Sequence, residues 1–446
     1  MRTIGELLKR DLNQRIEEVV KVNQTDEETV YRELTEYVAT ESIREHYRTL
    51  FQAIAEMPAQ PHDGVGVWVS GFFGSGKSSF VKNLGYVLAN RKVLGYAASE
   101  LFKQVIGDPR ISEYIDYINS RIPIEVLMFD VSVERAVKTG QQKLAEVMYT
   151  VLLRELDYAE DHDIAELEIE LEAEGRLAEF IEICGQLYRD QVRSTLDLTQ
   201  PLPPGIPEEL REAYAVWRII RKGAQKIARS SAILHTMAPE TYPSADTWAK
   251  ALKPTPLTVN KFVERAYELM ARRRPGKALV YIIDEVGQYV ARSADKIDDL
   301  RAVIEQLGKE GVNRTKKRQA VMPIWVIVTS QEKLEEVVAA IDSKRIELAR
   351  LKDRFRYRVD LAPSDIREVT TKRVLAKKEE AVPLLRDLYR QHQGKLNAAC
   401  RLERTTRKSD VSETEFIQFY PYLPHYMELS IDIVSGMRLQ PGAPQH

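Results

Sequence analysis

Four mainly hydrophobic runs along the chain predict buried strands. They cover residues 65–70, 123–131, 278–283 and 321–328. A strand of a parallel sheet is buried on both faces, so its sequence is a continuous apolar stretch rather than an alternation. Directly after the first run, residues 79–88 carry apolar side chains at helical spacing. This succession predicts an α/β fold in which a parallel sheet is flanked by helices.

Helical patterning also fills the segments outside these strands. Residues 26–34 carry acidic side chains early, as at a helix start, and Pro58 and Pro61 interrupt the chain before the first strand. We expect five regions, in chain order: a helical N-terminal segment (1–62), the first half of the sheet domain (63–139), a helical acidic insertion (140–275), the second half of the sheet domain (276–362), and a helical lid with the start of a C-terminal region (363–446).

The composition gives no overall attraction to nucleic acid or to membranes. The chain has 65 Lys and Arg against 67 Asp and Glu, a net charge of −2, so a nucleic-acid contact would need a local basic patch. The two cysteines, Cys184 and Cys400, fit no metal-ligand spacing and suit a reducing compartment. Neither a signal-peptide pattern nor an apolar run of membrane-spanning length occurs. We therefore expect a soluble cytoplasmic protein without a membrane partner.

The first part of the insertion is strongly acidic. Its glutamates have a single basic neighbour nearby in the sequence, Arg176; they are Glu166, Glu168, Glu170, Glu172, Glu174 and Glu179. Such a run is either a face that docks a partner or mimics DNA, or a solvated helix face. Because charge runs usually solvate a surface, we predict the solvated face.

A glycine-rich loop joins the first strand to its helix. Residues 71–78 read G-F-F-G-S-G-K-S and fit the phosphate-binding pattern G-x-x-x-x-G-K-[ST]. Glycines let successive backbone N–H groups point at one anion, and the helix N-terminus adds partial positive charge. In this pattern Lys77 contacts the β- and γ-phosphates, and the Ser78 hydroxyl ligates Mg²⁺.

The loop therefore predicts a bound nucleoside triphosphate with Mg²⁺. The residues expected to contact it are Gly71, Phe72, Phe73, Gly74, Ser75, Gly76, Lys77, Ser78 and Ser79. A chance Gly/Ser turn is disfavoured, because both flanks of the motif fit the strand–loop–helix context. Binding without hydrolysis stays open on this motif alone.

Two carboxylates end the third hydrophobic run. Asp284 and Glu285 follow residues 278–283, and ligands of open α/β sheets bind at the carboxyl ends of the strands. Asp284 is predicted to hold Mg²⁺, directly or through water, and Glu285 to orient and polarise the attacking water. The alternative is a chance Asp-Glu pair, but the upstream phosphate-binding motif favours the catalytic role.

Two further residues are candidates for sensing the phosphate and stabilising its charge. Ser330 follows the fourth run and is either a γ-phosphate or water sensor or an ordinary helix cap. Arg354 lies in a cationic stretch downstream and is our preferred arginine finger, which stabilises charge on the transferred phosphoryl group. The same stretch can equally be an exposed basic edge, and a finger acting in trans requires oligomers.

Two basic clusters lie at residues 272–274 and 314–318. Each either contacts phosphate backbones or forms a solvated loop. Because the overall charge balance is close to neutral, we favour solvated loops.

Longer stretches of the chain resemble one known family. G-V-W-V-S-G-F-F-G-S-G-K-S-S-F, from Gly66 to Phe80, looks like the P-loop of the large ATPases of bacteriophage exclusion (BREX) systems, the BrxC/PglY family. Residues 283–289 resemble its Walker B strand, and residues 328–334 the strand that follows. Further similar segments are residues 19–24, 33–40, 352–355 and 419–424. The resemblance covers most of the chain and is weakest in the acidic insertion.

This resemblance implies an AAA+-like P-loop ATPase, with ATP and Mg²⁺ as its ligands, in a multi-gene antiphage system. In such systems host DNA is methylated and phage propagation is blocked. The implied partners are other BREX proteins and further copies of the chain, with DNA as a candidate. Ser79 stands where we expect histidine in this family. Its members are usually longer, so the resemblance implies either their N-terminal ATPase portion or a short relative.

Three functions are therefore compared. The first is an Mg²⁺-dependent ATPase that assembles or remodels a defence complex, with DNA as a candidate platform. The second is a nucleotide-gated oligomeric scaffold with little hydrolysis. The third is an origin-loader-like AAA+ protein that acts directly on DNA, for which binding should be salt-sensitive. We favour the first; Glu285 separates it from the second, because a catalytic base is needed for hydrolysis but not for ATP binding.

Overall fold

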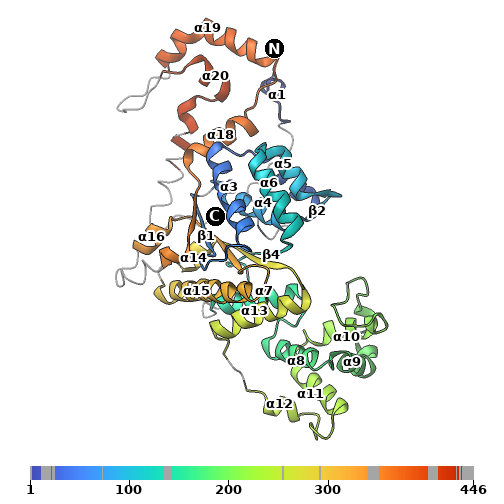
Figure 1. The fold of residues 1–446 in the computed structure, drawn as a ribbon. Helices are drawn as coiled ribbons and strands as arrows, with labels where there is room; N and C mark the ends of the chain where they lie inside the picture. The colour runs from blue at the N-terminus through green and yellow to red at the C-terminus, as the bar shows by residue number, and fades with distance from the viewer. Residues whose placement is uncertain are drawn as a thin grey trace.

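The computed structural model has a five-stranded parallel sheet at its centre (Figure 1). The strands are β1 (Gly66–Ser70), β4 (Ile124–Asp130), β5 (Ala278–Asp284), β6 (Trp325–Ser330) and β7 (Tyr357–Asp360). Their order across the sheet is β4-β5-β6-β1-β7, and every neighbouring pair is parallel. The structure describes residues 3–11, 22, 26–72, 74–134, 143–253, 256–290, 293–339, 351–399, 410–427, 429–430 and 433. The predicted α/β fold with a parallel sheet is confirmed, and β7 is a strand that the hydrophobic pattern did not indicate.

Helices cover both faces of this sheet. On one face lie α4 (Lys77–Ala89), α3 (Glu41–Glu56), α5 (Ala98–Ile106) and α6 (Pro109–Arg121), and on the other α7 (Leu144–Glu155), α13 (Val259–Arg273) and α15 (Ala294–Lys316). Helix α4 approaches the strands closely at Gly85, where a Cβ atom would lie 2.6 Å from Met128 Sδ and 2.8 Å from Ile282 Cδ1. On the opposite face the Tyr281 hydroxyl donates to the Met148 carbonyl of α7 (3.3 Å).

The remaining elements lie around this sheet domain or extend the molecule at its two ends (Figure 1). They are α1 (Ile4–Leu7), α2 (Glu27–Thr35), β2 (Lys92–Val93), β3 (Tyr96–Ala97), α8 (His162–Ala173), α9 (Leu177–Val192), α10 (Arg211–Ile220), α11 (Lys226–Met237), α12 (Thr247–Ala251), α14 (Val286–Val290), α16 (Leu334–Ala339), α18 (Pro363–Arg373), α19 (Ala381–Ala399) and α20 (Glu413–Phe419). None of the described helices combines the length and the apolar character that crossing a membrane requires.

The expected insertion, residues 140–275, is helical where it is described, but only its middle projects from the sheet domain. Its first and last long helices, α7 and α13, pack on the sheet, whereas α8 to α12 form the projecting part (Figure 1). The boundary of the separate helical unit therefore lies inside the predicted one.

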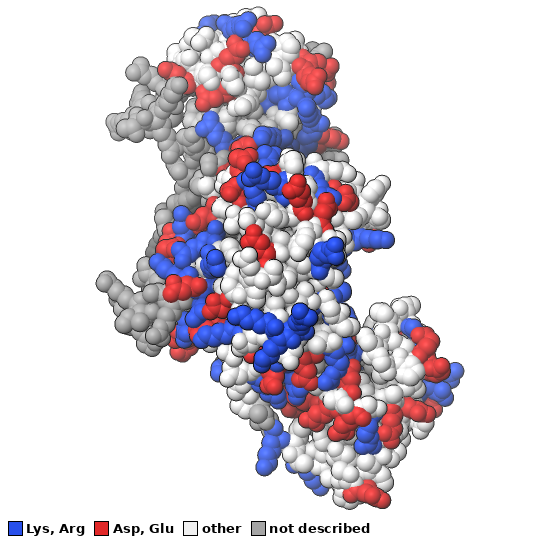
Figure 2. Space-filling view, viewed as in Figure 1, with Lys and Arg blue, Asp and Glu red and all other residues white. Residues whose placement is uncertain are grey.

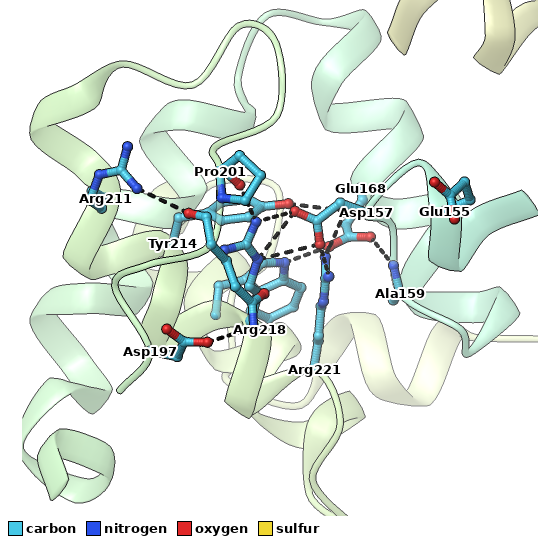
Figure 3. Close-up of polar contacts among 12 residues, drawn as sticks. Glu155, Asp157, Ala159, Glu168, Asp197, Pro201, Arg211, Tyr214, Arg218 and Arg221 are labelled. Atoms are coloured by element: carbon cyan, nitrogen blue, oxygen red, sulfur yellow. Dashed lines mark hydrogen bonds and ion pairs between the residues drawn. The ribbon is translucent and has the colours of Figure 1, made fainter. Parts of the chain in front are cut away.

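Buried ion pairs hold the projecting helices together (Figure 3). The Arg221 guanidinium donates to Glu168 (2.8 Å) and to Asp157 (2.6 Å). Glu168 also accepts hydrogen bonds from the Trp217 indole (2.5 Å) and the Ala159 backbone (2.6 Å). Both oxygens of this carboxylate thus accept hydrogen bonds, from a loop, from α10 and from the residue that follows α10.

The predicted solvated acidic face is therefore wrong for half of the acidic run. Besides Glu168, Glu166 pairs with Arg265 (2.6 Å) and Glu172 with Arg273 (2.8 Å). The exposed members are Glu170, Glu174 and Glu179. Three of the six glutamates turn inward and neutralise arginines that lie far away in the sequence.

The N-terminal residues belong to the C-terminal part of the fold. Leu8 and Lys377 form an antiparallel bridge, with hydrogen bonds from Lys9 N to Ala376 O (2.8 Å) and from Lys378 N to Leu7 O (3.0 Å). The Leu7 side chain packs against α19. Within the predicted segment 1–62, the first residues thus contact the C-terminal part of the chain, whereas α2 packs against α5 and α3 against α6.

Candidate functional site

The loop between β1 and α4 has the backbone conformation that its glycines allow. All five residues of β1 are buried, and α4 begins at Lys77. Gly74 (φ 80°) and Gly76 (φ 89°) lie in the left-handed region, which L side chains rarely adopt. A Cβ atom at either position would meet nothing within 4 Å, so both glycines lie on the open side of the loop. Glycine is favoured at these positions because of the backbone conformation and not because space is lacking. Phe73 lies outside the described residues.

Lys77 and Ser78, in the first turn of α4, point toward the loop and the sheet. Lys77 is only 6% exposed, and its ammonium group donates to Gly71 O (2.8 Å) and Phe72 O (3.2 Å). The Ser78 hydroxyl donates to Asp284 Oδ2 (2.9 Å). Ser79 follows, half-buried. The amine and the hydroxyl are thus held at the N-terminus of a helix, where anions are stabilised.

Asp284 is buried at the carboxyl end of β5. Besides the Ser78 hydroxyl, its carboxylate accepts a hydrogen bond from the Thr329 hydroxyl of β6. Burial raises the pKa of Asp284, and the charge of Asp130 adds to the rise, while the two hydroxyl donors and Lys77 oppose it. A buried carboxylate with a neighbouring negative charge favours a nearby cation.

Glu285 follows Asp284 in a strained backbone conformation. Its φ is 59°, in the left-handed region, and its N–H donates to the Thr329 hydroxyl (3.0 Å). Its Oε2 atom is buried and has no hydrogen-bond partner within the described ranges. Burial, and next the charge of Asp284, raise the pKa of Glu285. A carboxylate with a raised pKa is the stronger base once ionised, which is what proton abstraction from water needs.

One strand of the sheet separates the glycine-rich loop from the two carboxylates. Strand β6 lies between β1, which leads into the glycine-rich loop, and β5, which ends in the carboxylates. Two strand spacings place these strand ends about 10 Å apart. The loop amides and Lys77 can bind an anion, the Ser78 and Asp284 oxygens suit Mg²⁺, and Glu285 can accept a proton. The residues present therefore fit a triphosphate with Mg²⁺.

Ser330 lies near this site but faces the other way. Its hydroxyl accepts a hydrogen bond from Glu332 N (3.1 Å) in the turn after β6. A Cβ atom at Gly287 of α14 would lie 2.1 Å from Ser330 Oγ. Successive side chains of a strand point to opposite faces, and Thr329 is the one that faces Asp284. In this conformation Ser330 accepts a hydrogen bond within the turn after β6, and its role as a sensor stays a prediction.

Arg354 lies at the opposite edge of the sheet. It pairs with Asp63 (2.9 Å) and Glu305 (3.4 Å), and its carbonyl oxygen would lie 2.6 Å from a Cβ atom at Gly66, the first residue of β1. The glycine-rich loop follows the last residue of β1, so Arg354 does not reach the loop of its own chain. A finger that acts in trans stays a prediction.

The sequence analysis missed two residues of the site, Thr329 and Asp130. Asp130 is the last residue of β4 and Thr329 the last but one of β6, and the sheet aligns Asp130 with Asp284 in adjacent strands. The sequence does contain a pattern that indicates Asp130: it stands at the end of the mainly apolar run of β4, as Asp284 stands at the end of the run of β5. For Thr329 the corresponding pattern is the polar end of β6, where the sequence analysis predicts its neighbour Ser330 instead.

The basic clusters have different environments. In the first cluster, residues 272–274, every arginine forms an ion pair within the chain. Arg272 and Arg273 pair with Glu172 (3.2 and 2.8 Å), and Arg274 pairs with Glu125 (3.5 Å). That cluster is neither a solvated loop nor a free phosphate contact. In the second cluster Arg314 pairs with Glu310 (2.6 Å). Its remaining cations are exposed and form no ion pair with any described residue; they are Lys316, Lys317 and Arg318.

Comparison with models of protein families assigns no family. No family model matches the chain. The function has to be inferred from the arrangement of the site residues.

Proposed function

We propose that the protein is an Mg²⁺-dependent ATPase with an AAA+-like P-loop core. The observation that supports it best is the hydrogen bond between Ser78 and Asp284 (2.9 Å), which are 206 residues apart in the sequence. It joins the end of the glycine-rich loop to the acidic end of β5. A hydroxyl and a carboxylate at this junction are the oxygen ligands that Mg²⁺ takes beside nucleotide phosphates.

Each residue of the site has a role in this proposal. Backbone N–H groups of residues 71–78 and the Lys77 ammonium bind the phosphates of ATP. Ser78 and Asp284 hold Mg²⁺, which neutralises phosphate charge. Glu285 orients the attacking water and takes its proton, and its raised pKa suits that role.

The wider setting follows the resemblance to the BrxC/PglY family of BREX systems. We propose a cytoplasmic protein that uses ATP to assemble or remodel an antiphage defence complex, with other BREX proteins and further copies of itself as partners. The Gly66–Phe80 segment and residues 283–289 support this assignment. An active site completed by an arginine from a neighbouring subunit would make hydrolysis depend on oligomerisation.

The test is steady-state ATP hydrolysis with Mg²⁺ over a range of protein concentrations, together with ATP binding. We expect Lys77→Ala to lose binding and hydrolysis, and Glu285→Gln to bind ATP but not hydrolyse it. Matched controls are Lys92→Ala and Glu170→Gln, since both side chains are exposed and lie outside the site. Turnover per subunit that rises with concentration would support a shared active site.

Two outcomes would contradict the proposal. Failure of the wild-type chain to bind ATP would remove the nucleotide-binding role altogether. Hydrolysis by Glu285→Gln at the wild-type rate would remove the catalytic base. ATP binding that depends on Lys77 without any turnover would instead indicate the nucleotide-gated scaffold.

A further inference from the structure

A groove of 720 Å³ lies where the N-terminal residues meet α18, α19 and α20. None of its lining residues belongs to the β1–α4 loop, and its apolar lining includes Leu375, Val382 and Ile417. The charged residues that line it are Lys9, Arg367, Glu368, Lys372 and Lys377, four cations and one acid. Figure 2 shows Lys and Arg side chains, interspersed with Asp and Glu, in the region where α18 joins the C-terminal helices to the sheet domain. The local balance is thus basic although the whole chain is almost neutral.

Lys377 is a half-buried cation of this groove. Its ammonium group donates to the carbonyl oxygens of Leu375 and Gln418, the latter at 3.3 Å. No carboxylate of the described residues pairs with it, and burial lowers its pKa to about 8. A half-buried ammonium without a countercharge is destabilised, so an anionic ligand in the groove would be bound favourably.

Of the other cations of the groove, Arg367 pairs with Glu415 (3.4 Å), whereas Lys9 and Lys372 can contact an anion. Lys9 is exposed. Lys372 pairs with Glu368 (2.6 Å), but both side chains are about half exposed, and exposed ion pairs contribute little. Exchanging such a partner for a phosphate group therefore costs little free energy.

Aromatic side chains adjoin the same groove. Phe419 lines it, with the Arg367 guanidinium 4.7 Å from its ring centre. The backbone turns there, since Tyr422 N donates to Phe419 O (2.8 Å). Tyr422 is 55% exposed and Tyr426 49% exposed. Tyr422, three residues after the groove-lining Phe419, has an exposed ring on which a base can stack.

We propose that this groove binds single-stranded nucleic acid. Lys9, Lys372 and Lys377 contact backbone phosphates, and Tyr422 stacks on a base. Cations that follow a backbone, combined with exposed rings, are the usual elements of sequence-tolerant single-strand binding. An acidic peptide would satisfy the cations but would leave the tyrosine faces without a role. The proposal does not rest on ATP hydrolysis, because no residue of the β1–α4 loop takes part.

The test is fluorescence anisotropy of a labelled oligothymidylate titrated with the full chain, without nucleotide, at several salt concentrations. We expect saturable, salt-sensitive binding. Lys377→Gln should weaken it and lower the slope of log affinity against log salt by about 0.7, the loss of one phosphate contact on a single strand. Tyr422→Ala should weaken binding roughly fivefold or more, as loss of one stacked base does, without changing that slope.

Lys316→Gln is the matched control, since Lys316 is an exposed lysine at the end of α15 and outside the groove. The proposal is overturned if the oligonucleotide does not bind, or if Lys316→Gln weakens binding as much as Lys377→Gln. It is also overturned if polyglutamate competes as well as unlabelled oligothymidylate, which would make the groove an acidic-peptide site. Duplex DNA that binds as tightly as the single strand would remove the single-strand preference. Thermal melting of each variant separates loss of binding from loss of folding.

Discussion

At the scale of single residues, one hydroxyl group contacts both acidic residues of the site. Thr329 donates to the Asp284 carboxylate and accepts from the backbone N–H of Glu285. The left-handed conformation of Glu285 costs a non-glycine residue about 1–2 kcal/mol. Such strain persists where the surroundings hold it, and it occurs often at functional sites. Thr329 is therefore a positioning residue for the pair.

We predict that Thr329→Val lowers kcat for ATP hydrolysis by roughly tenfold to a hundredfold. Valine keeps the shape but removes a hydrogen bond to a charged group, which contributes about 1.5–3 kcal/mol. KM should change little, because Lys77 and the loop remain. The measurement is steady-state kinetics of the wild type, Thr329→Val and Thr329→Ser.

Thr329→Ser is the matched control, because it restores the hydroxyl and should recover most of the activity. Equal kcat in Thr329→Val and the wild type would show that the hydroxyl does not position the carboxylates. Equal losses in the valine and serine variants would point to packing instead.

The same scale shows why some site residues were predicted and others were not. Lys77, Ser78, Asp284 and Glu285 sit in local motifs, and the structure brings Ser78 and Asp284 together. Choosing between Thr329 and its neighbour needs the pairing of β6 with β5, because consecutive strand residues face opposite sides. That pairing is a long-range property, which a single sequence does not contain.

At the scale of elements, the projecting helices depend on buried charge. Arg221 and Glu168 are both almost fully buried, and the pair is completed by Asp157. Taking charges out of water is expensive, so such a pair is stable only when every partner is present. The partners of Glu168 and Glu166 lie 53 and 99 residues away. The acidic run could not be interpreted correctly because only its local neighbours were visible in the sequence.

We predict that Glu168→Gln destabilises the projecting helices by about 3 kcal/mol, because it removes one partner of a buried ion pair. Glu170→Gln, on the exposed side of the same helix, should have almost no effect. Limited proteolysis and hydrogen exchange of α8 to α10 measure this locally, which suits a chain with several structural units. Equal protease resistance of the two variants would contradict the prediction.

The same scale explains the position of Arg354. Because all strands of the sheet are parallel, residues just before a strand lie at the edge opposite to residues just after one. Arg354 precedes β7 (Tyr357–Asp360), whereas the glycine-rich loop follows β1. The sequence analysis predicts Arg354 beside the phosphate because the hydrophobic pattern does not indicate that a strand, β7, follows it.

At the scale of the whole molecule, three contacts tie the N-terminal part to distant elements. Lys82 of α4 pairs with Glu33 of α2 (2.6 Å) in a buried site. The Thr40 hydroxyl, which caps α3, donates to Asp365 of α18 (2.6 Å). The first residues bridge to Lys377. The N-terminal part therefore connects the helix after the glycine-rich loop with the helices that follow β7.

The last of these contacts is tested by truncating one buried side chain. Leu7 packs with Ala381 and Leu385 of α19 in a small cluster separate from the main core. We predict that Leu7→Ala loosens α19 by about 2 kcal/mol, the low end for a buried leucine, because a small cluster can close over the space left. Hydrogen exchange in α19 and α20 should become faster, while α4 stays protected. Ile4→Ala is the matched control, since Ile4 is 44% exposed and its loss should leave exchange unchanged. Unchanged exchange of α19 in Leu7→Ala would mean that the C-terminal helices are held by α18 and not by the start of the chain.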